Sequence, residues 1–175
     1  AVADGICKKL IYRHPHVFGD VAVSGSGEVL QNWEELKRKE KHQETAADSV
    51  DSVARSLPGL WRAEKIQKKA RKAGFDWPDV SGALDKLSEE VEELRTAVAE
   101  GSNIQEELGD LLFAAVNVSR FVQVDPEDAL SGACDKFARR FRQVEQSAAE
   151  RGQALEHMTL AEMDKLWDAA KEHEA

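Results

Sequence analysis

Residues 86–117 constrain the fold of this chain more strongly than any other stretch. They contain two pairs of acidic residues three positions apart, Glu90 with Glu93 and Glu107 with Asp110. Residues at this spacing share a face of an α-helix, so each pair would present its carboxylates together. Around both pairs, apolar residues recur every three or four positions, as in an amphipathic helix. The sequence therefore predicts two helices, each with an acidic edge.

The apolar residues predict the side of each helix that faces the core. They are Leu84, Leu87, Val91, Leu94 and Val98 in the first helix, and Ile104, Leu108, Leu111, Ala115 and Val118 in the second. We expect both stripes to be buried, with the flanks at the edge of the core. The flanks carry Lys86, Glu90 and Glu93 in the first helix, and Asn103, Glu107, Asp110 and Asn117 in the second.

A short turn is expected between the two helices. Gly101 suits the left-handed conformation that ends a helix, and Ser102 with Gln105 has the spacing of a capping box that begins one. Because the connection is short, the helices should be antiparallel neighbours. The two acidic pairs are about equally far from the turn, so they should reach the same height, and four carboxylates could converge.

Such convergence would favour a bound divalent cation. Carboxylates a few ångströms apart repel one another unless a positive charge lies between them. All four side chains offer oxygen, and no His or Cys stands at ligand spacing beside them, so Mg²⁺ or Mn²⁺ fits better than Zn²⁺. Iron fits less well, because di-iron bundles use Glu-x-x-His. The alternative is an acidic helix face that is only solvated, which is a common arrangement.

The composition favours an all-α protein. Among the 175 residues, prolines and aromatics are few, and no sustained alternation of apolar and polar residues predicts strands. The length suits one domain with an appended segment. The net charge of −9 argues against a general nucleic-acid-binding protein, which needs a basic surface.

The cysteines and the apolar runs bear on the compartment. Cys7 and Cys134 are far apart and match no zinc or redox spacing, so we expect reduced thiols. No stretch has the pattern of a signal peptide or a membrane span, since the most apolar run, residues 111–118, is short. We therefore expect a cytoplasmic protein with no membrane partner.

Three further features are predicted before the hairpin. A highly charged helix is expected over residues 28–41, and the polar stretch at 43–52 is expected to be a linker. The next helix is expected to begin at the motif Ser-Leu-Pro, with Ser56 as its N-cap and the proline in its first turn. It should end at Gly74.

The long helix after the hairpin is basic in an acidic protein. It is expected to begin at Asp125 and to carry Lys136, Arg139 and Arg140. Guanidinium groups bind phosphate oxygens in bidentate fashion, so this helix could bind a polyphosphate. The alternative is ordinary pairing with nearby glutamates. After it, the motif Thr-Leu-Ala-Glu from position 159 predicts a capping box for the last helix.

Taken together, these motifs resemble the MazG family of nucleoside triphosphate pyrophosphohydrolases. The family signature, E-E-x-x-E followed by E-x-x-D, is matched by EEVEE at 89–93 and ELGDLLF at 107–113. Four further segments also resemble sequences of the family: SLP at 56–58, KIQK at 65–68, GFDW at 74–77 and KFARRF at 136–141. The resemblance covers 57–167 and is to the catalytic C-terminal domain of long MazG proteins. It implies an all-α helical bundle of the NTP-pyrophosphatase type, built around an antiparallel carboxylate-bearing hairpin.

The resemblance also implies a domain organisation. Residues 1–18 look like the tail of a preceding MazG-like domain. Residues 19–55 would be a linker that contains the charged helix, and residues 56–175 would be the catalytic domain.

The resemblance further implies roles for individual residues. Mg²⁺, or Mn²⁺ in its place, would be held by Glu90, Glu93, Glu107 and Asp110. The phosphates would be contacted by Lys86, Lys136, Arg139 and Arg140, and the nucleotide would be further surrounded by Asn103, Glu106, Asp110, Asn117 and Trp167. Glu89 and Glu106 are candidate general bases, and the sequence does not choose between them. Family members often carry lysine where this chain has Asn103, so one phosphate contact is in doubt.

The implied reaction is Mg²⁺-dependent hydrolysis of a nucleoside triphosphate to the monophosphate and pyrophosphate, with water attacking the α-phosphorus. The implied assembly is a homodimer in which paired hairpins form a bundle. The alternative function is a non-catalytic helical module that binds a nucleotide or a regulatory partner. A metal-storage bundle ranks third, because the expected histidines are absent.

Overall fold

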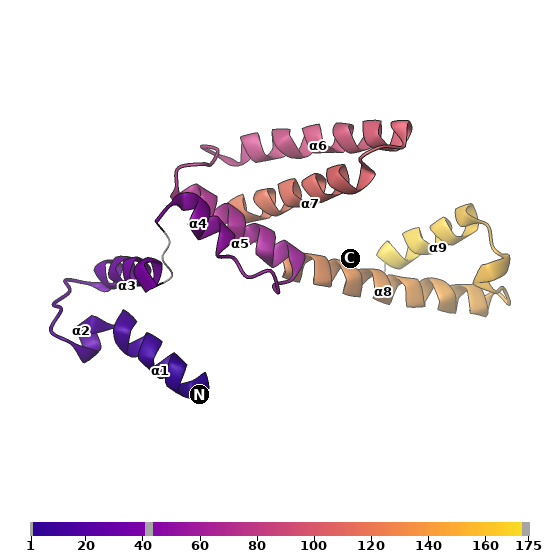
Figure 1. The fold of residues 1–175 in the computed structure, drawn as a ribbon. Helices are drawn as coiled ribbons and strands as arrows, with labels where there is room; N and C mark the ends of the chain where they lie inside the picture. The colour runs from indigo at the N-terminus through magenta and orange to yellow at the C-terminus, as the bar shows by residue number, and fades with distance from the viewer. Residues whose placement is uncertain (1, 41–43, 173–175) are drawn as a thin grey trace. The chain divides into compact units, whose positions relative to one another are not determined.

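The computed structural model describes residues 2–40 and 44–172, and every regular element in these ranges is a helix (Figure 1). The predicted all-α class is confirmed. The chain divides into two compact units, Ala1–Pro78 and Asp79–Ala175. The domain limits expected after residues 18 and 55 stay a prediction. In the described ranges, no helix combines the length and the apolar character needed to span a membrane.

In the first unit, the first and third helices are held together by charged and aromatic side chains. Its elements are α1 (Val2–Arg13), α2 (Pro15–Phe18), α3 (Ser26–Glu40), α4 (Ala46–Asp51) and α5 (Gly59–Lys72). Arg13 Nη2 lies 2.7 Å from Glu40 Oε2, and the Arg13 guanidinium lies 5.5 Å from the centre of the Trp33 ring. The charged helix predicted at 28–41 is therefore α3, packed on α1 by ion pairing and cation–π contact. Its predicted last residue lies outside the described ranges.

Helices α4 and α5 differ from the sequence-based expectation in their local detail. Helix α4 occupies a stretch expected to be linker, because Thr45 and Asp48 form a complete capping box at its start. Ser56 is not the N-cap of α5, which begins after Pro58. Gly74 has φ of +88° just past the end of α5, so its predicted role as a helix stop is confirmed.

The second unit consists of two helical hairpins (Figure 1). Its elements are α6 (Val80–Glu100), α7 (Ile104–Phe121), α8 (Pro126–Glu150), a 3₁₀ turn (Leu155–His157) and α9 (Leu160–Glu172). Helices α6 and α7 pack together as predicted, and α9 folds back on α8. The core of the α8–α9 hairpin is formed by Val144, Ala148, Met158 and Leu166.

The helix starts in this unit follow local capping chemistry. The Asp125 carboxylate accepts hydrogen bonds from the backbone amides of Glu127 and Asp128 at the start of α8. At the start of α9, Thr159 and Glu162 exchange the hydrogen bonds of a capping box. Both predicted starts are confirmed.

The turn between α6 and α7 was only partly predicted. Gly101 has φ of 68° and ends α6, as expected. Ser102 is not the N-cap of α7, because Asn103 takes that position with φ of 54°. Asparagine is one of the few side chains that adopt this left-handed conformation readily, so the turn closes with two left-handed residues.

The apolar stripe of α6 is not buried in this unit, so that prediction was wrong. Leu84, Val91 and Val98 are 46%, 39% and 59% exposed. The buried positions of α6 are Ala83, Glu90 and Ala97. Helix α6 therefore turns its flank toward α7, because two small alanines on that flank let the helices approach closely.

The apolar stripe of α7 is likewise exposed to solvent in the first turns of the helix. Ile104 and Leu108 are 42% and 46% exposed, while the buried residues of this helix are Ala114, Val116, Asn117 and Arg120. On the flank of α7, Ala114 and Asn117 are thus buried, whereas Asn103 and Asp110 are exposed, as are the first turns of the apolar stripe.

Candidate metal and nucleotide site

Three carboxylates from the two helices of the α6–α7 hairpin meet at one point. Glu90, Glu93 and Glu107 each offer an oxygen, and these oxygens lie within 4.8 Å of one another. The antiparallel packing of α6 on α7 brings Glu107 to the height of the pair on α6. The predicted convergence thus occurs for three of the four acidic side chains. Asp110 is exposed and lies outside this group.

Glu90 is the most buried member of the cluster. Its side chain is 6% exposed, and Oε1 lies 2.8 Å from Lys86 Nζ. Its other oxygen, Oε2, is buried and makes no hydrogen bond within the described part of the chain. A buried carboxylate oxygen without a donor is costly, and a divalent cation would satisfy it. The donor set is all oxygen, so it fits a hard cation.

Lys86 supplies positive charge to the cluster. Its Nζ donates a hydrogen bond of 2.8 Å to Glu89 Oε1 and lies 4.0 Å from Glu93 Oε2. The hydrogen bonds to Glu89 and Glu90 hold the pKa of Lys86 well above its ordinary value. Lys86 therefore remains protonated and offsets part of the negative charge that the glutamates bring together.

Lys86 does not offset all of the unfavourable charge in the cluster, as the pKa of Glu93 shows. Removal of water around its carboxyl raises its pKa, and the nearby carboxylates of Glu90, Glu89 and Glu107 raise it further. Lys86 acts in the opposite direction but does not cancel these effects. The ionised cluster is thus electrostatically unfavourable by itself, and a cation at this point would relieve it.

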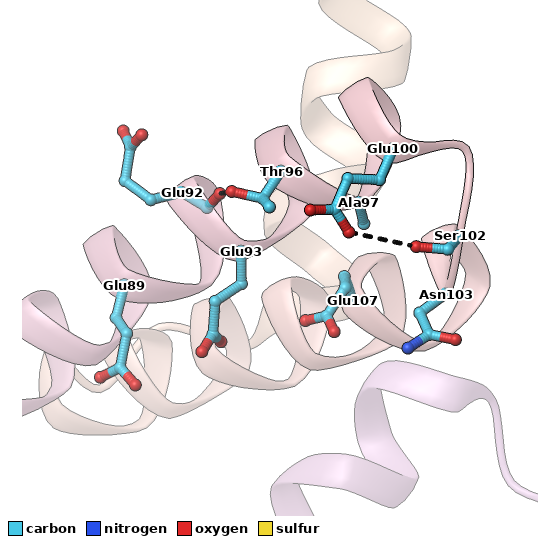
Figure 2. Close-up of a pocket in the computed structure, with 9 residues that line it drawn as sticks. All are labelled: Glu89, Glu92, Glu93, Thr96, Ala97, Glu100, Ser102, Asn103 and Glu107. Atoms are coloured by element: carbon cyan, nitrogen blue, oxygen red, sulfur yellow. Dashed lines mark hydrogen bonds between the residues drawn. The ribbon is translucent and has the colours of Figure 1, made fainter.

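An acidic pocket of about 340 Å³ adjoins the cluster. Figure 2 shows that Glu89, Glu93 and Glu107 extend to the same side of the hairpin, whereas Glu92 extends away from them. The turn residues Ser102 and Asn103 also line the pocket. Asn103 thus lies where the sequence placed it, beside the acidic edge.

The two candidate general bases are both exposed, Glu89 on α6 and Glu106 on α7. Glu89 accepts the hydrogen bond from Lys86 and lines the pocket. Glu106 is exposed in the first turn of α7 and does not line this pocket. The arrangement places Glu89 nearer the cluster, while the role of either residue stays a prediction.

Apart from Lys86 on α6, the predicted phosphate-binding residues lie on the α8–α9 hairpin, as does Trp167. Lys136 and Arg139 are exposed on α8, and Arg140 is half-buried. Trp167 on α9 packs against Phe137, with ring centres 5.0 Å apart. None of these residues lines the acidic pocket of the α6–α7 hairpin.

Sequence reasoning missed Arg120, which lies beside the predicted nucleotide-binding residue Asn117. Both are buried on α7, and the Arg120 guanidinium donates two hydrogen bonds to Asn117 Oδ1. The spacing of three residues on the flank of α7 was the available signal, because it places the two side chains on one face.

Comparison with known proteins places the hairpin inside a recognised domain. Residues 79–145 match the family model described as the MazG nucleotide pyrophosphohydrolase domain. This range contains α6, α7 and most of α8, and so includes the whole carboxylate cluster.

Similarity to known sequences extends over almost the whole chain. The chain is 42% identical over 177 aligned residues to the nucleoside triphosphate pyrophosphohydrolase of Escherichia coli, covering 99% of this chain and 67% of that protein. It is 40% identical to the nucleoside triphosphate pyrophosphohydrolase/pyrophosphatase MazG of Thermotoga maritima, covering 94% of this chain and 62% of that protein. It is also 49% identical to the uncharacterized protein YabN of Bacillus subtilis, of which it covers 36%. The chain therefore spans about two thirds of the length of the first two relatives.

Proposed function

The chain belongs to the MazG nucleotide pyrophosphohydrolase family, and we propose that it hydrolyses nucleoside triphosphates to nucleoside monophosphates and pyrophosphate. The observation that carries the proposal is the convergence of Glu90, Glu93 and Glu107, together with the buried Oε2 of Glu90, which has no hydrogen-bond donor among the described residues. The activity for which the Escherichia coli and Thermotoga maritima relatives are named supports the reaction type.

The proposed cofactor is Mg²⁺, with Mn²⁺ as the other candidate. Glu90, Glu93 and Glu107 would hold it, and Asp110, which lies outside their cluster, is the fourth proposed ligand. When bound, the ion would offset the negative charge of the phosphates and polarise them toward attack. The all-oxygen donor set supports this choice, as does the raised pKa of Glu93, which is caused first by desolvation of its carboxyl and further by the neighbouring carboxylates.

In the proposed reaction, a water oxygen forms a bond to the α-phosphorus, and the bond to the bridging oxygen of the pyrophosphate breaks. The proton that the water loses would go to Glu89 or Glu106. Glu89 is the better supported of the two, because it lines the pocket beside the cluster. Lys86, which lies 4.0 Å from Glu93 Oε2, would bind a phosphate oxygen beside the cluster.

The residues of the α8–α9 hairpin would bind the rest of the phosphate chain. Lys136, Arg139 and Arg140 provide the cationic groups that stabilise a departing pyrophosphate. Asn103, Asn117 and Trp167 would lie around the nucleoside. In this proposal, Asn103 contributes a neutral side chain to the pocket where many family members have lysine.

We also propose that two copies of the chain associate through the α6–α7 hairpin. The apolar stripe of α6 is exposed at Leu84, Val91 and Val98, and α7 adds Ile104 and Leu108. Exposed apolar side chains in such a row favour burial against a partner. For the compartment, cytoplasm stays our prediction; the exposed thiols of Cys7 and Cys134 suit a reducing environment.

Product analysis tests the function directly. The protein is incubated with each common nucleoside triphosphate and Mg²⁺, and the products are separated by chromatography, with EDTA in a parallel sample. Monophosphate and pyrophosphate should appear only with the metal. Diphosphate and phosphate would contradict attack at the α-phosphorus. Nucleotide binding without any turnover would favour the non-catalytic nucleotide-binding module.

A further inference from the structure

Arg120 is a buried cationic side chain to which the proposed reaction assigns no task. It lies on α7 and is 8% exposed, as is Asn117 one turn before it. Its Nε and Nη2 atoms donate to Asn117 Oδ1 at 3.1 Å and 2.6 Å. The guanidinium also lies over the Phe121 ring, 4.5 Å from its centre. Neighbours on α7 therefore hold the guanidinium in a defined position against Asn117.

These hydrogen bonds determine which way the Asn117 amide faces. A guanidinium group has donors only, so it can bond the oxygen of an amide but not the nitrogen. The Nδ2 group of Asn117 is thus turned away from Arg120. The side chain makes no other hydrogen bond within the part of the chain that the structure describes, so this donor remains available to a ligand.

Asn117 lies on the helix face that carries the carboxylate cluster. Positions 107, 110, 114 and 117 follow one another at helical spacing, and Ala114 and Asn117 are buried on that face. Glu107 and Asn117 are separated along α7 by roughly 15 Å, from ten residues at the helical rise. An extended nucleoside triphosphate can span this distance. The nucleoside of a triphosphate held at the cluster is therefore within reach of Asn117 when it extends along α7 away from the turn.

We propose that Arg120 is a positioning residue for substrate binding. It holds Asn117 with its NH₂ group outward, where that group donates a hydrogen bond to an acceptor oxygen of the nucleoside. This inference rests on the proposed nucleotide hydrolysis. Arg120 then sets the affinity for the nucleoside part of the substrate, through Asn117, and leaves the chemistry at the α-phosphorus unchanged.

Kinetics of three variants test the inference. Arg120→Met removes the hydrogen bonds but keeps a long apolar side chain, Asn117→Ala removes the proposed donor, and the third variant combines both changes. Each single variant should raise KM for the preferred triphosphate about five- to tenfold, the effect of one lost hydrogen bond, with kcat little changed. The double variant should be no worse than Asn117→Ala, because Arg120 acts through that residue.

Inorganic tripolyphosphate separates positioning from a general structural role. It has no nucleoside, so its inhibition constant should be the same in wild type and in all three variants. Arg95→Met is the matched control, because Arg95 lies on the exposed side of α6 and pairs with Glu92. It should leave KM unchanged. Arg120→Lys should restore part of the affinity, since an ammonium group can also donate to Oδ1.

Several outcomes would overturn the inference: an unchanged KM in Arg120→Met, effects that add in the double variant, or an equal loss of affinity for tripolyphosphate. If Arg120→Met does not fold, the comparison of Arg120→Lys with wild type decides by the same criteria. Side-chain amide NMR signals of Asn117, recorded without nucleotide, provide a readout that does not depend on activity. They should shift in the Arg120 variants, and unchanged signals would refute the positioning. A wild-type protein that hydrolyses no triphosphate would refute the proposed function instead.

Discussion

The Lys86 ammonium lies 2.8 Å from the carboxylate of the buried Glu90, one turn away on α6. In the protein without metal, this contact gives Glu90 its cationic partner. The same lysine also donates to Glu89, so one ammonium group serves two carboxylates at the edge of the cluster. A metal ion bound at the cluster would therefore act together with Lys86 to neutralise Glu90.

The first prediction concerns the loss of this lysine. Lys86→Met should lower the melting temperature measured in EDTA, because Glu90 then lacks its cationic partner. Saturating Mg²⁺ should raise the melting temperature by a larger amount in the variant than in wild type. If Lys86 also contacts phosphate, KM should rise about tenfold or more.

Lys171→Met is the matched control for the Lys86 experiment. Lys171 pairs with Asp168 on the exposed surface of α9, so its loss removes a similar ion pair without uncovering a buried charge. Equal effects of the two substitutions on stability in EDTA would contradict the special role of the contact between Lys86 and Glu90.

The second prediction concerns Glu90 itself. Glu90→Gln keeps the shape of the side chain but removes the charge that would bind metal, so turnover should fall at least about 100-fold while the helical circular dichroism stays unchanged. Titration calorimetry with Mg²⁺ should show weaker binding. Asp85→Asn, an exposed change on the same helix, should retain both properties. Full activity in Glu90→Gln would refute the metal assignment.

Features set by neighbouring residues in the chain could be predicted from sequence. Gly101 ends α6, and the Thr159–Glu162 capping box begins α9, because each depends on backbone conformation within a few residues. Ser102 was wrongly predicted as the cap of α7. The neighbouring Asn103 takes that position in the left-handed conformation, which asparagine tolerates. Local chemistry alone did not decide between the two.

Features set by packing could not be predicted in the same way. The apolar stripe of α6 indicated a buried face, yet Ala83 and Ala97 on the flank allow closer contact with α7. Which face is buried depends on the packing partner, and periodicity does not identify it. Arg120 was missed for a similar reason, since an arginine in a helix reveals its role only when its burial and its bond to Asn117 are known.

The third prediction is a pH-dependent gain in stability from Glu93→Gln. The folded protein raises the pKa of Glu93 above its ordinary value of 4.5, so the folded state holds this proton more tightly than the unfolded state. Protonation of Glu93 therefore stabilises the folded wild-type protein fully at pH values below 4.5. This stabilisation is lost as the pH rises through the raised pKa of the folded state. At neutral pH in EDTA, the variant should therefore melt at a higher temperature than wild type.

The difference between Glu93→Gln and wild type should disappear as the pH falls below the ordinary value of 4.5. With Mg²⁺ at neutral pH the order should reverse, because wild type gains a bound cation and the variant loses a ligand. Asp85→Asn removes the same charge from an exposed position of α6 that does not line the acidic pocket, and serves as the control. A variant less stable than wild type at neutral pH in EDTA would contradict the repulsion within the cluster.

The fourth prediction concerns association through the exposed stripe. If a second copy covers Leu84, then Leu84→Glu places a charge in the interface, and the dissociation constant of the dimer should rise at least about 30-fold. Sedimentation velocity over a concentration series measures this change. Leu160→Glu is the control, because Leu160 is 71% exposed on α9, in the other hairpin. A wild-type protein that remains monomeric throughout the series would refute the proposed interface, and a dimer unaffected by Leu84→Glu would place the contact elsewhere on the chain.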